Sequence, residues 1–342
     1  MKQVKTIVAL IAGLFAFTSV QAGEMTVTGS MQATYQSEVD DVTGNPLGMN
    51  TDLTFSGSVD TDFGTATMSL ATDGTFLGDS GADHTMSLAT ALGTITIGNA
   101  GDSANAVDDI TPSAFEEANG SGSGTYSTDL GSGMDGSMSL KYGNSDLLGT
   151  GVSASVSYYP KLDGTTNNEK AASASASDAK KSALSANVGI PVSGVPFVGD
   201  TVLGGAKITL GYEKSDPQLA TYQAKEGGTI AVVMPVGPLS VGYQKKKFAP
   251  VSSANGTKEN YYDDILGIAY AVNDDFSISY NQYESRKATN AGTQIEQETE
   301  AFNIAYVIGG LTLGFQDAKT TNAGYSSGTD DDTRTLSIKT AF

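Results

Sequence analysis

The sequence predicts an all-β fold, namely a 16-stranded antiparallel β-barrel that spans a membrane. The prediction depends on sixteen segments of alternating apolar and polar residues, on connections that are alternately short and long, and on the way the chain ends. The last segment places Leu336, Ile338 and Phe342 on one face and stops at Phe342. Such a strand would leave an open edge in a soluble fold, whereas a closed barrel pairs it with the first strand.

Residues 1–22 are predicted to be a secretory signal peptide. Lys2 and Lys5 precede an apolar stretch over residues 7–20, and a small-x-small pattern ends at Ala22. The stretch is shorter than the ~20 residues that a membrane helix needs, although an uncleaved N-terminal anchor is the alternative. We therefore expect residues 1–22 to be removed after export and residues 23–342 to form the barrel.

Composition narrows the class of partner. The chain has 38 acidic residues, 19 basic residues and no Cys, with a formal charge of −19 that becomes −21 once Lys2 and Lys5 are removed. The absence of Cys excludes a disulfide scaffold and thiol chemistry. The negative charge disfavours nucleic acid and acidic partners, and it is compatible with divalent cations and cationic solutes.

Alternation with a period of two recurs along the whole mature chain. One face of each segment is apolar, and the other carries mostly Ser, Thr, Asn and Gly, which suits lipid outside and water inside a barrel. The sixteen predicted strands centre on residues 25–36, 52–62, 66–70, 86–88, 95–97, 138–142, 152–158, 184–190, 208–212, 230–234, 239–243, 266–270, 276–280, 302–306, 311–315 and 336–342.

The connections alternate in length, as they do in outer-membrane barrels. Tight turns are predicted at Gly64, Gly93, Gly237, Asn273 and Gly309, because Gly and Asn permit the required backbone. The other connections are long and polar, and cover residues 37–50, 73–83, 161–180, 215–226, 249–259, 287–297 and 319–332. The connection 191–205 falls on the short side yet is long and rich in Gly and Pro, so a miscounted strand is the alternative there.

With this layout, the chain resembles the general diffusion porins of Gram-negative outer membranes over essentially the whole mature sequence. The most specific local match is the segment Ala-Leu-Gly-Thr-Ile-Thr-Ile-Gly-Asn at 91–99, which a long acidic segment follows. The resemblance implies a passive channel in the bacterial outer membrane, without enzymatic activity, that forms a homotrimer. It also implies contacts with outer-membrane lipid, lipopolysaccharide and the barrel assembly machinery, and passage of small ions and solutes.

The resemblance further implies that the third loop, residues 100–135, folds into the barrel and narrows the pore. Its candidate residues for the acidic side of the constriction are Asp102, Asp108, Asp109, Glu116 and Glu117. Carboxylates in a narrow passage with low-dielectric walls attract cations and repel anions. The alternative is that some of these acids solvate a loop at the surface.

The opposite wall departs from the family pattern, because no Lys or Arg lies between Gly23 and Leu140. Strand parity predicts basic side chains in the lumen only at Lys141, Lys207, Lys246 and Lys339. The same parity directs Asp52 and Asp60 inward. We therefore predict a pore that prefers cations.

Two further features concern assembly. The outward residues of the second to fifth predicted strands are small and apolar, and of the 15 Tyr only Tyr35 precedes residue 126. Such a face, without the usual aromatic girdle, suits the trimer contact that the family forms with these strands, although chance clustering is the alternative. Phe342 resembles the terminal aromatic signal that the barrel assembly machinery reads.

Other signals are weak. No cofactor is expected, although Asp330–Asp332, Asp40–Asp41 and Asp263–Asp264 could hold Ca²⁺ or Mg²⁺ in loops, without EF-hand spacing. His84 is the single His of a chain without Cys, which disfavours zinc and Cys–His sites. The alternatives to a diffusion channel are a substrate-specific outer-membrane channel and an extracellular Ca²⁺-binding β-solenoid or adhesin.

Overall fold

The computed structural model describes residues 25–38, 44–73, 83–125, 129–131, 134, 137–162, 182–194, 199, 201–216, 224–250, 258–292 and 294–342. The predicted signal peptide, 1–22, lies outside these residues, as does Asp135 at the end of the predicted third loop. Among the described residues, no helix is both long and apolar enough to cross a membrane.

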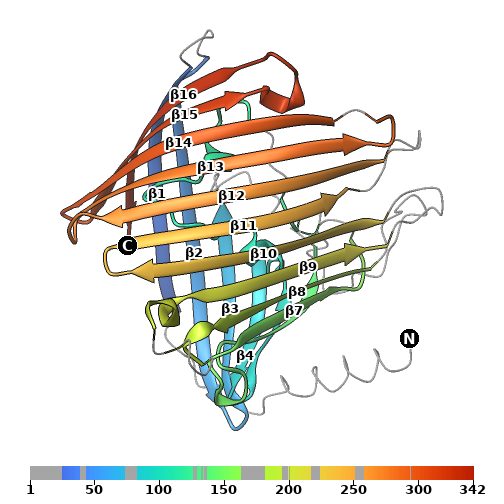
Figure 1. Ribbon diagram of the computed structural model, residues 1–342. Helices are drawn as coiled ribbons and strands as arrows, with labels where there is room; N and C mark the ends of the chain where they lie inside the picture. Colours follow the sequence, from blue (N-terminus) through green and yellow to red (C-terminus); the bar gives the residue numbers. More distant parts are fainter. Residues whose placement is uncertain are drawn as a thin grey trace.

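Sixteen antiparallel strands close into one barrel, in which every strand pairs with its neighbours in the sequence and β1 pairs with β16 (Figure 1). This confirms the predicted fold class. The strands are β1 (Met25–Glu38), β2 (Leu47–Thr61), β3 (Gly64–Asp73), β4 (Asp83–Thr90), β5 (Gly93–Gly98), β6 (Ser139–Asn144), β7 (Ser153–Tyr159), β8 (Ala183–Pro191), β9 (Lys207–Ser215), β10 (Lys225–Val236), β11 (Leu239–Ala249), β12 (Glu259–Ala271), β13 (Phe276–Thr289), β14 (Gln294–Ile308), β15 (Leu311–Thr321) and β16 (Asp331–Ala341).

Alternation decides which face of each strand meets the lumen. In β11, Tyr243 is exposed on the outer face and Gln244 is fully buried on the inner face. In β14, Phe302 and Asn303 show the same contrast. A shift of register by one residue would exchange the two faces of a strand. The register is therefore fixed by the need to place apolar side chains outside and polar ones inside.

The chain end closes the barrel as the sequence predicted. Ala341 of β16 lies opposite Ser30 of β1. Beyond it, Phe342 and Gly29 exchange two backbone hydrogen bonds, each with an N···O distance of 3.0 Å. The edge of the last strand is consequently paired, which removes the open backbone groups that a membrane could not satisfy.

In the long connection at 191–205, the described residues 192–194, 199 and 201–205 form turns and no additional strand. The connection contains two 3₁₀ turns, η4 (Val192–Gly194) and η5 (Val202–Gly205). Val192 N–H donates to the Ala206 carbonyl at 2.8 Å, which closes the turn. A Cβ on Gly204 would lie only 2.0 Å from the Gly199 carbonyl oxygen. Glycine is required there because the two halves of the turn touch through their backbones.

Several strands extend further than the sequence predicted. The gap predicted at 287–297 is largely strand, since β13 continues to Thr289 and β14 begins at Gln294. Both faces of these strand ends carry polar residues, such as Gln282 and Glu284 outside and Ser285 inside. Without an apolar face the alternation is invisible in the sequence, which therefore assigns these strand ends to loops.

Candidate pore constriction

The segment between β5 and β6, residues 99–138, is named loop 3. Its described residues lie inside the barrel against the inner faces of β7 to β16 (Figure 1). Side chains of the wall hydrogen-bond to the loop at successive points along this path. The pairs, wall residue first, are Ser157–Ser103, Ser185–Ala104, Gln244–Asp108, Asn281–Pro112, Gln316–Glu116, Thr320–Ser123 and Thr333–Ser121.

Glycines on the inner wall allow the loop to approach this closely. A Cβ on Gly242 of β11 would lie 2.3 Å from Pro112 Cδ, and one on Gly314 of β15 would lie 2.5 Å from the Phe115 ring. Distances this short require something to move. The wall strands therefore carry glycine where the loop rests on them.

The middle of loop 3 packs on the inner wall through an apolar cluster. Ala118 begins the 3₁₀ turn η2 (Ala118–Gly120) and packs on inward side chains of β12 to β15. Its neighbours are Ile265, Tyr283, Ala301 and Ala318, each at most 3% exposed. At this point loop 3 and the inner wall are therefore in direct apolar contact.

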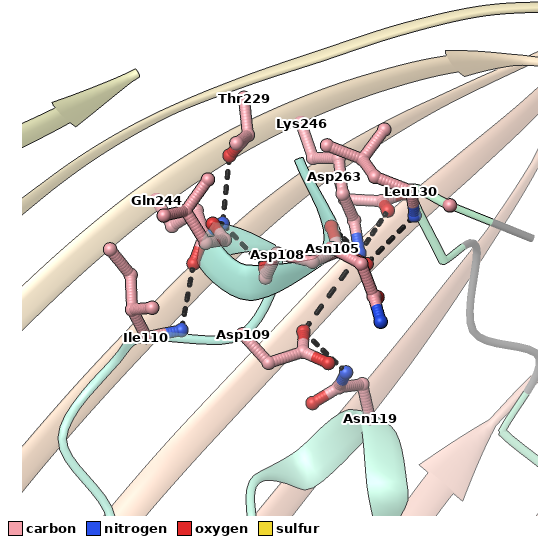
Figure 2. A network of polar contacts seen from close by, with 12 residues as sticks. Asn105, Asp108, Asp109, Ile110, Asn119, Leu130, Thr229, Gln244, Lys246 and Asp263 are labelled. Atoms are coloured by element: carbon pink, nitrogen blue, oxygen red, sulfur yellow. Dashed lines mark hydrogen bonds and ion pairs between the residues drawn. The ribbon is translucent and has the colours of Figure 1, made fainter. Parts of the chain in front are cut away.

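An ion cluster fixes the loop beside the turn η1 (Asn105–Val107) (Figure 2). The Lys246 ammonium of β11 lies 3.1 Å from Asp108, 3.9 Å from Asp109 and 3.8 Å from Asp263 of β12. The side chains of Lys246, Asp108 and Asp263 are at most 1% exposed. Burial raises the pKa of the Asp108 carboxyl, and the Lys246 ammonium opposes that rise.

The five predicted acids of loop 3 therefore have different surroundings. Asp102 is buried and accepts hydrogen bonds from the backbone N–H groups of Ala104 (2.7 Å) and Asn105 (3.0 Å) and from the Ser185 hydroxyl (2.6 Å). Like Asp108, it anchors the loop to the wall. Neither carboxylate lies open to the lumen.

The remaining three acids are less buried. The Asp109 side chain is 41% exposed and accepts a hydrogen bond of 2.9 Å from the Asn119 amide. Glu117 accepts one of 3.0 Å from the Thr111 hydroxyl, and burial together with the nearby Asp109 charge raises the pKa of Glu117 to about 7. Burial also raises the pKa of the half-buried Glu116 carboxyl.

The four predicted basic residues are also in different places. Lys246 is buried in the ion cluster, and Lys141 of β6 donates to the Ala100 carbonyl at 3.2 Å. Lys207 and Lys339 are exposed, near one end of β9 and of β16. The ion cluster thus removes one positive charge from the surface of the lumen.

The strands β1 to β5 carry acids on their inner face. Asp52 accepts hydrogen bonds from the Ser30 hydroxyl (2.9 Å) and the Asn50 amide (3.2 Å), and Asp60 accepts one from the Thr65 hydroxyl (2.8 Å). Asp83 of β4, which sequence reasoning missed, accepts one of 3.1 Å from the Asn99 amide. All of these donors are neutral. In the described part of these strands, the hydrogen bonds orient the carboxylates without neutralising them.

Sequence reasoning also missed the partners that hold the loop. Asp263 and the buried pair of Glu213 and Lys225, with 3.0 Å between the charged atoms, all have inward parity. Glu213 accepts a hydrogen bond from the Gly131 backbone N–H, which ties the returning part of loop 3 to β9. Applying the parity rule beyond the apolar part of each strand would have found them.

The acidic groups considered for Ca²⁺ or Mg²⁺ are placed as follows. Asp331 and Asp332 of the group Asp330–Asp332 are successive residues of β16, opposite Thr320 and Lys319 of β15, so their side chains point to opposite faces. Asp263 and Asp264 are successive residues of β12 and point to opposite faces, so they cannot share an ion. Asp40 and Asp41 lie outside the described residues. Within the described chain, Asp108, Asp109 and Asp129 each bring an oxygen within 4.8 Å of the others, and the Lys246 ammonium supplies a positive charge beside them.

Comparison with known proteins agrees with this geometry. The family described as Gram-negative porin matches residues 7–313. No curated protein matches the chain by sequence.

Solved structures share the fold at low sequence identity. OmpT, an outer membrane protein of Vibrio cholerae, matches with a TM-score of 0.67 and 11% identity over 95% of this chain and 99% of that chain. An anion-selective porin from Comamonas acidovorans matches with a TM-score of 0.64 and 12% identity over 94% of this chain and 100% of that chain. Salmonella typhi OmpF matches with a TM-score of 0.64 and 13% identity over 94% of this chain and 98% of that chain. With the family matched over most of its length, the chain belongs to the Gram-negative porins, which form channels in the outer membrane.

Proposed function

We propose that this porin is a passive, water-filled channel for small hydrophilic solutes and ions, that it prefers cations and that it catalyses no reaction. The preference for cations is carried by one observation, the negative charge on the inner face of β1 to β5, the part of the wall that loop 3 does not cover. Strands β1 to β5 present Asp52, Asp60 and Asp83 through neutral hydrogen-bond donors, and no Lys or Arg lies between residues 23 and 140.

The loop supports the same preference from the other side of the lumen. The Asp109 side chain is 41% exposed, and Glu116 and Glu117 are half-buried. On the basic side, Lys246 and Lys225 are buried in ion pairs with Asp108 and Glu213. An excess of negative charge in a passage with low-dielectric walls raises the local cation concentration.

A substrate-specific channel would need side chains that follow the solute along an open track. Inward aromatic residues exist, but Phe248, Tyr261 and Tyr283 are at most 8% exposed because loops cover them. Their faces are therefore unavailable to a permeating solute. The lumen therefore favours a channel that selects solutes by their size and charge over one that recognises a single substrate.

We further propose that the protein is a homotrimer in contact with outer-membrane lipid and lipopolysaccharide. An apolar groove of about 650 Å³ crosses the outer face of β1 to β5 and is lined by residues such as Met68, Met86 and Ile97. Among the similar structures, OmpT of Vibrio cholerae is described in a trimer form (TM-score 0.62, 10% identity, 94% of this chain and 100% of that chain). The mass of the detergent-solubilised protein tests this, and a monomer would contradict it.

The preference is tested by the reversal potential of the pure protein in a planar bilayer under a KCl gradient. We expect the sign of a cation-selective channel, and a smaller value in the D52N/D83N variant, because two oriented negative charges are lost. D317N is the matched control, since Asp317 lies on the outer face and pairs with Arg334 at 2.9 Å. An anion-selective wild type, or equal potentials in D52N/D83N and wild type, would contradict the proposal.

A further inference from the structure

The connection between β15 and β16, residues 322–330, is named loop 8. It contains the 3₁₀ turn η6 (Ala323–Tyr325) (Figure 1). Tyr325 is only 6% exposed, although it belongs to a connection that the sequence places among the long polar loops. Its ring packs against Tyr261 of β12, with 5.5 Å between ring centroids, in a cluster that includes Ala104 and Leu130 of loop 3. Loop 8 therefore contacts the loop that narrows the lumen.

The Tyr325 hydroxyl also starts a chain of polar contacts that ends on loop 3. Its oxygen lies 2.6 Å from the Ser285 hydroxyl of β13, and Ser285 donates its one hydroxyl proton to Asp263. Tyr325 must therefore be the donor to Ser285. Asp263 lies 3.8 Å from the Lys246 ammonium, which lies 3.1 Å from Asp108 of loop 3 (Figure 2).

A second link joins the two loops through their backbones. Gly324 N–H donates to the Gly124 carbonyl and to the Gln297 side-chain oxygen, both at 3.0 Å. A Cβ on Gly124 would lie 2.9 Å from Ala323 Cβ, so the loops touch directly. Beside this contact, the hydroxyl oxygens of Ser123 and Thr320 are 2.6 Å apart.

The backbone of η6 indicates that this arrangement is held by its contacts. Asn322 and Tyr325 have φ values of +52° and +59°. Asn visits this left-handed region readily, but a bulky residue such as Tyr does so only when its surroundings hold it there. The buried ring and the hydrogen bond to Ser285 are the contacts that hold Tyr325.

We propose that loop 8 pins loop 3 to the barrel wall, with Tyr325 as a positioning residue for the pore constriction. The inference rests on the proposed function, because it takes loop 3 to be the constriction of the channel. Removing the Tyr325 hydroxyl leaves Ser285 without its donor and loosens the support of Asp263 and Lys246. Loop 3 then leaves the wall more often and obstructs the lumen.

Single-channel recording tests the proposal with the Y325F variant. We expect the fraction of time spent at reduced conductance to rise about fivefold, the effect of losing one ordinary hydrogen bond. Y280F is the matched control, because Tyr280 donates a hydrogen bond of the same length, 2.6 Å, to Glu300 on the outer face. Equal behaviour of Y325F, Y280F and wild type would overturn the proposal.

Thiol chemistry gives a readout that does not depend on conduction, because the chain has no Cys and Ser123 is fully buried where loop 3 meets Thr320 of β15. In S123C, we expect added Y325F to speed labelling by a small water-soluble maleimide by about the same factor, because the thiol is reached only when loop 3 has left the wall. In S123C/T320C, an oxidised crosslink should return Y325F to the closure frequency of the wild type, and reduction should restore the closures. An unchanged labelling rate would overturn the inference even if the channel conducts, whereas a faster rate in a protein that does not conduct would overturn only the proposed function.

Discussion

Asp108 and Asp109 are neighbours in the sequence, yet they have opposite environments. Asp108 is buried against Lys246, while Asp109 is 41% exposed. The sequence predicted both as acids of the constriction, because the number and spacing of carboxylates do not say which way a loop residue points. The direction follows from η1, which turns the backbone so that Asp108 meets β11. The number of carboxylates in the sequence of loop 3 therefore overestimates the negative charge that is exposed to a solute in the lumen.

At the same scale, the raised pKa of Glu117 predicts that the proposed ion selectivity depends on pH. Its pKa of about 7 means that the carboxyl is mostly neutral at pH 5 and mostly ionised at pH 9. We therefore expect the reversal potential in a KCl gradient to become more cation-selective as pH rises through 7. E117Q should reduce this rise, because an amide does not titrate.

The control for this titration is E298Q, since Glu298 lies on the outer face of β14 and accepts a hydrogen bond from the Gln282 amide. It should leave the pH profile unchanged. An E117Q profile identical to that of wild type would contradict the role given to Glu117.

At the scale of elements, the strands could be predicted from the sequence and the path of loop 3 could not. Alternation identifies a strand because its outer face must be apolar, as Tyr243 and Phe302 illustrate. Loop 3 has no period, and its path depends on distant wall residues such as Gln244, Gly242 and Lys246. The family resemblance supplied the expectation of a loop inside the barrel, while its contacts with β7 to β16 come from the structure.

Lys246 joins these elements, so its replacement should affect the stability of the loop and of the wall. K246M leaves Asp108 and Asp263 buried without their cation, which for buried pairs costs on the order of 3–5 kcal/mol. We expect K246M to unfold at a lower temperature than the wild type. The midpoint is measured from the fraction of protein that keeps the gel mobility of the folded barrel after heating. D108N/K246M should recover part of the loss, because the neutral amide that replaces the Asp108 carboxylate needs no counter-charge.

K247M provides the comparison for this variant, since Lys247 is the next residue of β11 and is exposed on the outer face. It should unfold at the wild-type temperature. If K246M does the same, the ion cluster contributes nothing to holding loop 3.

At the scale of the whole molecule, closure depends on the pairing of the first strand, β1, with the last, β16. The sequence predicted this from the alternation around Leu336 and Ile338, and the register of β1 with β16 confirms it. The strand number was also predictable, whereas the strand ends around Thr289 and Gln294 were not, because polar residues on both faces hide the alternation. The inner ion cluster escaped prediction because it joins residues far apart in the sequence.

Deleting Phe342 should impair assembly more than its 71% exposed side chain would suggest. The deletion removes both backbone hydrogen bonds with Gly29 as well as the terminal aromatic ring. We expect the yield of heat-modifiable barrel in the outer membrane to fall sharply, with F342Y close to wild type. A normal yield after deletion would show that neither contact is needed.

The glycines behind loop 3 have a consequence for the calibre of the channel. Gly242 and Gly314 let the loop rest on the wall with no side chain between them. A methyl group at either position would act as a spacer and push the loop toward the axis of the barrel. The bore can thus be reset by residues that no permeating solute ever touches, so related channels can evolve different size limits while keeping the same lining.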